Sequence, residues 1–341
     1  MIKKISIAYI LLVAFLSIFA YFFIPDKSTN ANQMHLSIHS KSPGFKVDLL
    51  LIENSINYNQ TIFEKLFFGN KNSPTEIPLQ NFEIDKNIFY YNEYGDFSDE
   101  FNNSIEIDNE FQNNNIINRI FLLGTDKFGR DVLSRLVIGA RISFFIGFIS
   151  VLISLIIGVI LGSLSGYYSG NIDRIIMWII NVTWSIPTLL LVIAITLALG
   201  KGLWQVFIAV GLTMWVDVAR VVRGQVMTIK ERQFITAARV LGFSDLRILT
   251  KHILPNIVSP LIIISAANFA ASILIESGLS FLGLGAQPPM ASWGSIIKDH
   301  YNYIILGKPM LALIPGICIM SLVMAFMLLG NKLRDKLDVK N

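Results

Sequence analysis

The sequence contains few of the residues that build disulfides and metal sites. It has one cysteine, Cys318, and four histidines among 341 residues. A single cysteine excludes an intrachain disulfide, and Cys318 is expected to be a buried apolar residue. His35 and His39 are four residues apart, but no third ligand stands near them, so both are expected to be solvated loop residues. The sequence therefore indicates no metal site in this chain.

The sequence also lacks the motif of a nucleotide-binding enzyme. Its two Gly-Lys pairs, Gly200-Lys201 and Gly307-Lys308, are not preceded by the glycine that a P-loop needs, and neither is followed by Ser or Thr. No set of catalytic residues stands out, and no basic surface for nucleic acid is indicated. We therefore expect no enzyme activity, no cofactor bound by this chain and no nucleic-acid partner.

Charged residues are scarce, at 15% of the chain, whereas hydrophobic residues make up 53%. A mean hydropathy of +0.57 is too high for a soluble domain of this length. Six apolar runs are close to the ~20 residues that cross a bilayer as a helix. The runs are Ile5–Ile24, Ile142–Leu164, Ile175–Leu199, Leu203–Val222, Ile257–Ile275 and Leu311–Leu329. No cleavage site follows the first run closely, which favours an uncleaved anchor over a signal peptide. The predicted fold class is an all-α membrane protein with six transmembrane helices.

The positions of Lys and Arg predict how these helices are oriented. Short loops rich in Lys and Arg face the cytoplasm in membrane proteins. The residues concerned are Lys3, Lys4, Arg174, seven residues from Arg220 to Lys251, Lys332, Arg334, Lys336 and Lys340. Both termini are therefore predicted to be cytoplasmic. Residues 27–118 then form a large external loop between the first two spans.

Residues 235–256, ITAARVLGFSDLRILTKHILPN, predict an amphipathic helix–turn–helix on the cytoplasmic side. The apolar positions of the first helix run up to Gly242, which can adopt a positive φ and end it. Ser244 and Asp245 can cap the second helix, and Pro255 stops it. A small basic projection of this kind is typical of a surface that docks a partner.

This pattern resembles the coupling loop of bacterial ABC-importer permeases, which inserts into a groove on a separate ATPase subunit. The resemblance rests on two alanines, one glycine and a Leu-Pro pair at matching spacing. The coupling residues that it implies are Thr236, Ala237, Ala238, Arg239, Gly242, Leu254 and Pro255. Thr236 departs from the family, in which a glutamate is usual at this position. The alternative is a short interfacial helix that only links two spans.

Other stretches resemble the dipeptide/oligopeptide branch of the same family. They are LGTDKFGRDVLSRLVIGARIS at 123–143, GYYSGNIDR at 166–174, WSIPTLL at 184–190 and ESGLSFLGLGAQPPMASWGSII at 276–297. The resemblance covers residues 123 to about 333. It implies an external substrate entrance at Asp126, Gly129, Arg130, Asp131, Glu276, Gly283, Gly285 and Trp293. Pro187 predicts a kink in the third span, which either serves gating or is static.

The resemblance implies a permease subunit of a peptide-class ABC importer in the bacterial plasma membrane. A second homologous permease would complete the pore, and two P-loop ATPase subunits would use ATP and Mg inside. A substrate-binding protein would deliver the peptide outside. Taken together, the apolar runs, the charge pattern and the resemblance predict an N-terminal anchor at 1–26, an external insert at 27–118, a permease domain at 119–333 with its coupling loop at 223–256, and a cytoplasmic tail at 334–341.

The external insert is acidic, with 13 acidic residues against six lysines in residues 27–115. Scattered aromatic and aliphatic residues predict that it is partly packed. One interpretation is a cap that contacts the substrate-delivery protein. The other is a lineage-specific insertion without a transport role.

Three alternatives to a peptide importer stay open. The same fold could import nickel or another small solute, and the sequence does not separate these cargoes. A self-contained secondary transporter is disfavoured, since it would show inverted repeats or several mid-membrane charges. The few intramembrane polar residues are Asp217 and Arg220, expected to neutralise each other, Glu276, and Asn181 and Asn268, expected to hydrogen-bond between helices. A membrane-anchored binding module would not need six spans.

Overall fold

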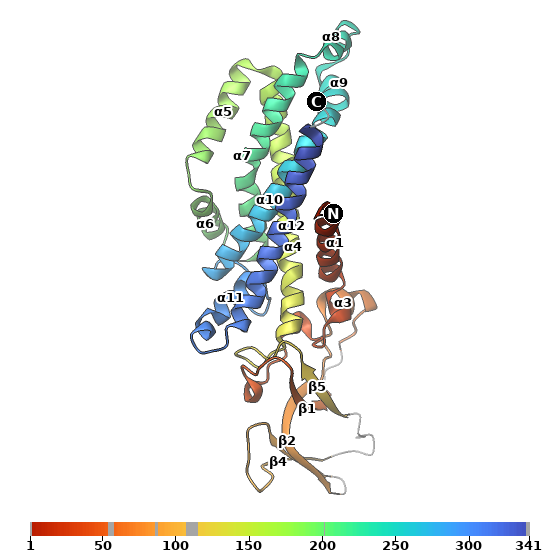
Figure 1. Cartoon of the computed structure of the whole chain (residues 1–341), viewed down its shortest axis with the longest axis vertical. Coiled ribbons are helices and arrows are strands. Elements are labelled where there is room, and N and C mark those ends of the chain that lie inside the picture. The colour runs from red at the N-terminus through yellow and green to blue at the C-terminus, as the bar shows by residue number, and fades with distance from the viewer. Residues whose placement is uncertain (1, 54–57, 86–87, 107–114, 201, 339–341) are drawn as a thin grey trace. The chain divides into compact units, whose positions relative to one another are not determined.

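Figure 1 shows the computed structural model, which describes residues 2–53, 58–85, 88–106, 115–200 and 202–338. Lys201 and Lys340, named above, lie outside the described residues. The chain forms two compact units. The helical unit consists of Met1–Val13, Ser143–Gln287 and Ile317–Asn341, and the sheet unit consists of Ala14–Ile142 and Pro288–Gly316.

Long apolar helices build the helical unit. They are α4 (Val132–Tyr168), α5 (Gly170–Trp184), α6 (Thr188–Leu199), α7 (Leu203–Lys230), α10 (Val258–Phe281) and α12 (Met310–Asp338), with the start of α1 (Ile2–Ile18). Between α7 and α10 lie α8 (Gln233–Val240), α9 (Asp245–Ile248), a π-helical turn (Leu249–Ile253) and a 3₁₀ turn (Leu254–Ile257). Within the described residues, four helices are long and apolar enough to cross a membrane, and the pair α5 and α6 adds a fifth span if it counts as one. The prediction of a mostly helical protein with several membrane-spanning helices is confirmed.

A stripe of three glycines brings α4 and α7 together. A Cβ added at Gly158 would lie 2.5 Å from Val218 Cβ, and one added at Gly162 would lie 2.5 Å from the Ala219 carbonyl oxygen. Gly166 continues the same spacing of four residues and approaches the carbonyl of Arg223. Small residues at this spacing let membrane helices approach closely, because no side chain separates their backbones.

The first predicted span is shorter in the structure than expected. The continuous helix α1 ends at Ile18, and a separate turn, α2 (Ala20–Phe23), follows. The Arg141 guanidinium donates hydrogen bonds to the carbonyl oxygens of Ser17 at 2.7 Å and Ile18 at 2.8 Å. The last carbonyls of a helix lack partners within it, so Arg141 stabilises the helix end at this position.

The third predicted span, Ile175–Leu199, is not a single kinked helix but two helices. α5 and α6 are bent by 92° at a break that contains Pro187. Pro187 has no N–H to continue the hydrogen bonds of α5, and its ring disfavours the helical conformation of Ile186. Pro187 instead stands at the N-cap position of α6.

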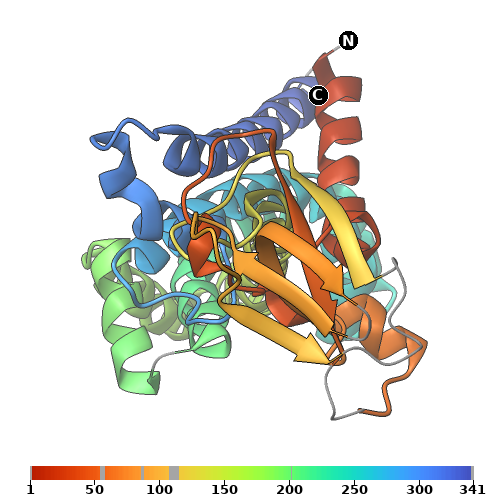
Figure 2. The ribbon, with the colours of Figure 1, turned by 90° about the horizontal axis from the view of Figure 1, so that it is seen from below.

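An antiparallel sheet in the sheet unit corrects the all-α prediction. Its strands are β1 (Phe45–Ile52), β2 (Thr75–Asp85), β3 (Ile88–Glu93), β4 (Asn103–Glu106) and β5 (Ile116–Phe121), in the order β4-β3-β2-β1-β5 (Figure 2). The runs FKVDLLLI and IFYYNE supply the branched and aromatic residues that favour strands. β5 extends past the predicted boundary at residue 118, because it pairs with β1 from Ile116 to Phe121.

Two apolar clusters hold this sheet. One contains Ile38, Val47, Leu49 and Phe121, and the other contains Leu50, Leu79, Phe89 and Tyr91. The packed sheet agrees with the expectation that residues 27–118 are not wholly disordered. The sheet unit also contains 3₁₀ turns at Thr29–Ala31, Leu36–Ile38 and Tyr301–Ile304, and the helices α3 (Ile62–Phe68) and α11 (Trp293–His300).

Candidate functional site

The segment between α7 and α10 folds as a compact helix–turn–helix in the helical unit (Figure 1). Its inner face is apolar, and Ile235, Ala238 and Ile248 are fully or almost fully buried. They join a cluster with Tyr167, Val218, Val222, Val226, Ile253 and Ile257. Because the cluster includes residues from α4 and α7, the segment is packed rigidly onto the long helices.

The turn between α8 and α9 depends on Gly242. This residue has φ 76°, as the sequence predicted, and donates its N–H to the Arg239 carbonyl at 2.9 Å. The N–H of Phe243 donates to the Ala238 carbonyl at 3.1 Å, which closes the end of α8. Ser244 stands at the N-cap position of α9, but its side chain makes no capping bond.

Polar contacts join the segment to α4, and α4 to α7. The Tyr167 hydroxyl donates to the Asp245 carboxylate at 2.6 Å, and the Lys230 amine donates to the Tyr167 carbonyl at 2.6 Å. The Arg239 guanidinium lies 5.8 Å from the centre of the Tyr167 ring. Sequence analysis missed Tyr167, because it precedes the segment by more than 60 residues.

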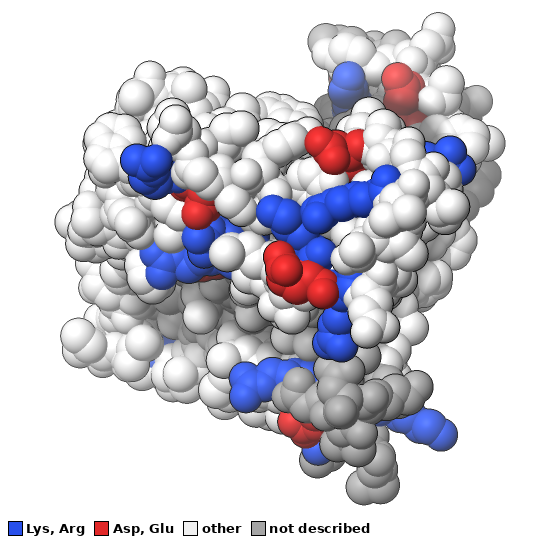
Figure 3. All heavy atoms as spheres, turned by 90° about the horizontal axis from the view of Figure 1, so that it is seen from above, with Lys and Arg blue, Asp and Glu red and all other residues white. Residues whose placement is uncertain are grey.

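The outer face of the segment is exposed and partly apolar. Val240 is 84% exposed, Leu241 72% and Leu246 71%, and these three residues form what we call the apolar tip. Thr236 and Ala237 are exposed beside them on α8. Lys and Arg side chains gather on the face seen in Figure 3, on which α8 and α9 lie.

The predicted coupling residues divide between the two faces. Thr236, Ala237, Arg239, Gly242 and Pro255 are exposed. Ala238 is 4% exposed, and Leu254 packs against the buried cluster. Ala238 and Leu254 therefore support the shape of the segment, whereas the exposed residues are available to a partner.

The predicted entrance residues of the sheet unit bond to one another. The Asp126 carboxylate accepts from the N–H groups of Phe128 at 2.8 Å and Arg130 at 3.0 Å, and it forms an ion pair with the Arg130 guanidinium at 2.6 Å. Asp126, Arg130 and Asp131 are all nearly fully buried. Asp131 caps α4 by accepting from the Ser134 N–H at 2.9 Å.

Gly129 is required by close backbone contact. Its φ is 73°, and an added Cβ would overlap the His35 carbonyl oxygen. Trp293 belongs to the same unit, is almost fully buried and donates from Nε1 to the Leu136 carbonyl at 2.9 Å. These contacts give the predicted residues a stabilising part in the sheet unit, and their place at an entrance stays a prediction.

Glu276, Gly283 and Gly285 lie in the helical unit. Glu276 is fully buried and accepts from the hydroxyls of Ser143 at 3.2 Å and Ser280 at 2.7 Å. A Cβ at Gly285 would overlap the Ser280 hydroxyl, so these residues pack against one another. Their arrangement stabilises the end of α10.

Asp217 and Arg220 were expected to neutralise each other, but they do not form an ion pair in the structure. The Arg220 guanidinium donates to the Asn181 side-chain oxygen at 3.0 Å and lies 3.7 Å from the centre of the Trp184 ring. This bond confirms that Asn181 links two helices. Asp217 is exposed on α7 and has no bonding partner among the described residues. The buried Asn268 amide nitrogen also has none, so no interhelical bond from it is observed within the described part of the chain.

A buried polar group in the sheet unit corrects the prediction for His35. Only His39 is exposed, whereas the His35 ring is buried between the Gly129 carbonyl at 3.1 Å and the Glu76 carboxylate at 3.1 Å. The Arg119 guanidinium donates to both Glu76 oxygens, at 2.6 and 2.7 Å. Burial raises the pKa of Glu76, but its bonds to His35 and Arg119 outweigh burial and hold this pKa below its ordinary value. Strand pairing brings these residues together, which no local motif could show.

Cys318 is half-buried in α12. Among the described residues, no group of three or more His, Cys, Asp and Glu side chains could hold a metal ion.

Comparison with known proteins agrees with this geometry. Residues 158–338 match the family described as binding-protein-dependent transport system inner membrane component. The glutathione transport system permease protein GsiD of Pectobacterium atrosepticum is 43% identical over 218 residues, which are 64% of this chain and 72% of that protein. The dipeptide transport system permease protein DppC of Bacillus subtilis is 43% identical over 217 residues, 64% of this chain and 68% of that protein. The oligopeptide transport system permease protein OppC of Escherichia coli K12 is 42% identical over 218 residues, with 64% and 72% covered.

A solved structure shares the fold. The chain resembles the MetNI methionine ABC transporter in an inward-facing conformation, with a TM-score of 0.50 and 20% identity over 59% of this chain and 95% of that chain. The sequence matches extend over the helix–turn–helix and the long helices around it, and they show a transport permease rather than an enzyme. The chain belongs to the family of binding-protein-dependent transport system inner membrane components.

Proposed function

We propose that this chain is the permease subunit of an ATP-binding-cassette importer that moves dipeptides or oligopeptides into the cytoplasm. The peptide cargo is suggested by relatives named for dipeptide, oligopeptide and glutathione transport. In this proposal a second homologous permease completes the pore, two ATPase subunits use ATP and Mg, and a binding protein delivers the cargo outside. Both termini and the helix–turn–helix lie on the cytoplasmic side.

The observation that carries the proposal is the contrast between the two faces of the helix–turn–helix. Its inner face is packed into the buried cluster, while the apolar tip is exposed to water. Exposed apolar patches on a rigid projection are typical of protein docking sites. A force applied to the tip would be transmitted to α4 and α7, because Tyr167 and the buried cluster connect the segment to both helices. Closure of the ATPases on ATP would then move the membrane helices as rigid bodies.

The coupling role is tested by changing the apolar tip. Val240→Asp and Leu241→Asp should each lower co-purification of the ATPase subunits by about tenfold or more, because each places a carboxylate in an apolar contact, where it would be buried without a partner when an ATPase subunit docks. Gln233→Asp is the matched control, because it adds the same charge at the exposed start of α8 where the helix dipole accepts it. Normal association and peptide-dependent ATP hydrolysis in both tip variants would contradict the proposal.

Cargo is tested with the assembled complex in proteoliposomes. ATP hydrolysis should rise when the binding protein is loaded with peptide. A response to nickel and none to peptide would favour the small-solute importer of the same fold. A chain that never retains an ATPase subunit, in detergent that preserves a known complex, would favour a self-contained secondary transporter.

The exposed face of α7 is a candidate wall of the pathway. Asp217 places an unbonded carboxylate on this face of a membrane helix, and a charge facing acyl chains is costly. In the proposed pathway between the two permeases, the Asp217 carboxylate would be hydrated. In a Cys318→Ser background, Asp217→Cys should react with a water-soluble thiol reagent in the assembled transporter, whereas Val218→Cys, which is buried, should not. Equal labelling of the two positions would show that this face of α7 does not line the pathway.

A further inference from the structure

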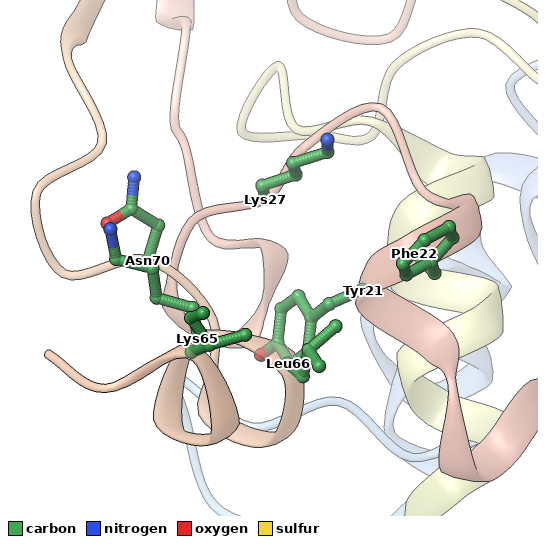
Figure 4. Close-up of a pocket in the computed structure, with 7 residues that line it drawn as sticks. Tyr21, Phe22, Lys27, Lys65, Leu66 and Asn70 are labelled. Carbon is green, nitrogen blue, oxygen red and sulfur yellow. The ribbon is translucent and has the colours of Figure 1, made fainter.

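A pocket of about 290 Å³ opens between α2 and α3 in the sheet unit. It is lined by Tyr21, Phe22, Lys27, Ile62, Lys65, Leu66 and Asn70. Figure 4 shows the Tyr21 ring and Leu66 between α2 and α3, with Lys27 above them on the chain after α2 and Lys65 and Asn70 on the opposite side. The pocket therefore combines an apolar floor with a polar, cationic edge.

The helices around the pocket expose large apolar side chains. Phe22 is 70% exposed and Phe23 53% on α2, and Phe63 is 75% exposed and Phe68 66% on α3. A Thr61–Glu64 capping box makes α3 a defined helix, so its exposed residues are held in place. Aromatic residues next to lysines at the end of an apolar helix are typical of the membrane–water boundary. Phe22 and Phe23 follow directly on the apolar helix α1.

The cationic edge is not neutralised by the protein. Lys27 and Lys65 are exposed, and neither amine has a carboxylate partner within 4 Å among the described residues. Their neighbours Asp26 and Glu64 are bonded elsewhere. The Asp26 carboxylate accepts from the backbone N–H groups of Ser28 and Gln33, and Glu64 accepts from the N–H of Thr61. An anion at this edge would therefore meet positive charge that no described carboxylate neutralises.

The pocket is held in shape before any ligand enters. Arg141 bonds to the end of α1 and donates to the Phe67 carbonyl of α3, while its guanidinium lies 5.2 Å from the centre of the Tyr21 ring. The Asn70 N–H donates to the Lys27 carbonyl at 2.8 Å, which joins the segment after α3 to the segment after α2. A preformed site loses little conformational entropy when a ligand binds.

We infer that this pocket binds one anionic phospholipid of the surrounding membrane. The phosphate lies at the polar edge, where Lys27 and Lys65 supply positive charge, and the first part of an acyl chain lies along Phe22 and Leu66. A phospholipid supplies both the anion and the apolar chain in one molecule, which suits the two sides of the pocket. The site goes beyond cargo transport, since it ties the start of the sheet unit to the bilayer surface. It does not depend on the cargo or on the orientation of the chain.

The test is native mass spectrometry of the full-length chain in detergent with added phosphatidylglycerol or phosphatidylcholine. Phosphatidylglycerol should be retained over phosphatidylcholine, and Lys27→Gln/Lys65→Gln should lower its retention by about tenfold or more, because the variant removes both positive charges that attract the anionic headgroup. Lys46→Gln/Lys298→Gln is the matched control, since both lysines are exposed residues of the sheet unit outside the pocket. It should retain the lipid as the unchanged chain does.

Three outcomes would overturn the inference. They are equal retention of the two lipids, unchanged retention in the Lys27/Lys65 variant, and full competition by water-soluble glycerol phosphate, which would indicate a site for free phosphate. A second measurement uses benzoylphenylalanine in place of Phe68 in cells. Its photoadduct should be a phospholipid, and an adduct with a second permease subunit would show that a protein covers this surface.

Discussion

At the scale of single residues, Gly242 shows how a turn depends on backbone freedom rather than on space. It has φ 76°, and an added Cβ would meet nothing within 4 Å. Gly242→Ala should therefore cost only backbone strain, about 1–2 kcal/mol, and Gly242→Asn should cost less because Asn tolerates this conformation. Hydrogen exchange of residues 233–248 measures the difference. Equal protection in the Ala and Asn variants would contradict it.

Gly129 represents the opposite case, in which space is decisive. Gly129 and Gly95 both have positive φ and both lie in the sheet unit, but only a Cβ at Gly129 would collide, with the His35 carbonyl. Gly129→Ala should therefore destabilise the sheet unit by about 1–3 kcal/mol more than Gly95→Ala, by overpacking. Limited proteolysis of the full chain reports this as faster cleavage within residues 14–142. Matching cleavage rates for the two variants would rule out the collision.

At the scale of elements, the bend between α5 and α6 is attributed to Pro187. In Pro187→Ala the restored N–H can donate to the Thr183 carbonyl, and Ile186 is freed to become helical. The two helices should then straighten, and spin labels at Ile175 and Leu197 should move apart. Both positions are exposed, so labels there disturb little packing. Pro260→Ala, in the first turn of α10, is the control. An unchanged distance would mean that tertiary packing sets the bend.

Local chemistry explains which elements the sequence predicted. The turn at Gly242 was predicted because a glycine that ends an amphipathic run is a local signal. The end of α1 was not predicted, because it depends on Arg141, which is more than 120 residues away in the chain. The spacing of Gly158, Gly162 and Gly166 was present in the sequence as a signal of close packing, but it did not identify α7 as the partner.

At the scale of the whole molecule, long-range pairing limited the prediction. Aromatic residues indicated that the external insert packs. They did not indicate that β5 completes its sheet by pairing with β1, about 70 residues earlier in the chain. His35 is buried against Glu76 of β2, which is distant in the sequence, so a solvated histidine was the wrong expectation. For the candidate site, the sequence predicted the helix–turn–helix but not the inward face of Ala238. Ala238→Glu would disturb the buried cluster and is therefore not a clean test of docking, whereas changes at Val240 and Leu241 are.

The stability of the sheet unit should fall in mild acid because of His300. Burial lowers the pKa of His300 from its ordinary value of 6.5. The neutral ring suits its surroundings, since Nδ1 lies 2.8 Å from the Ile296 carbonyl and Nε2 accepts from the Lys127 N–H at 3.5 Å. As the pH falls below about 6.5, the unfolded chain takes up the proton first. The free energy of unfolding then decreases, by at most about 1.4 kcal/mol per pH unit for one site.

Glu76 acts in the same direction at lower pH, because its pKa lies below the ordinary 4.5 and its stabilising effect is lost as it becomes protonated. Between pH 8 and pH 5, the change in the free energy of unfolding with pH should therefore come from His300. Hydrogen exchange of the sheet unit in the full chain should show constant protection from pH 8 to pH 7 and a decline below pH 6.5, after correction for intrinsic exchange. His300→Gln should flatten the decline, whereas His39→Gln, at an exposed position, should keep it. A decline that persists in His300→Gln would assign the acid sensitivity to another group.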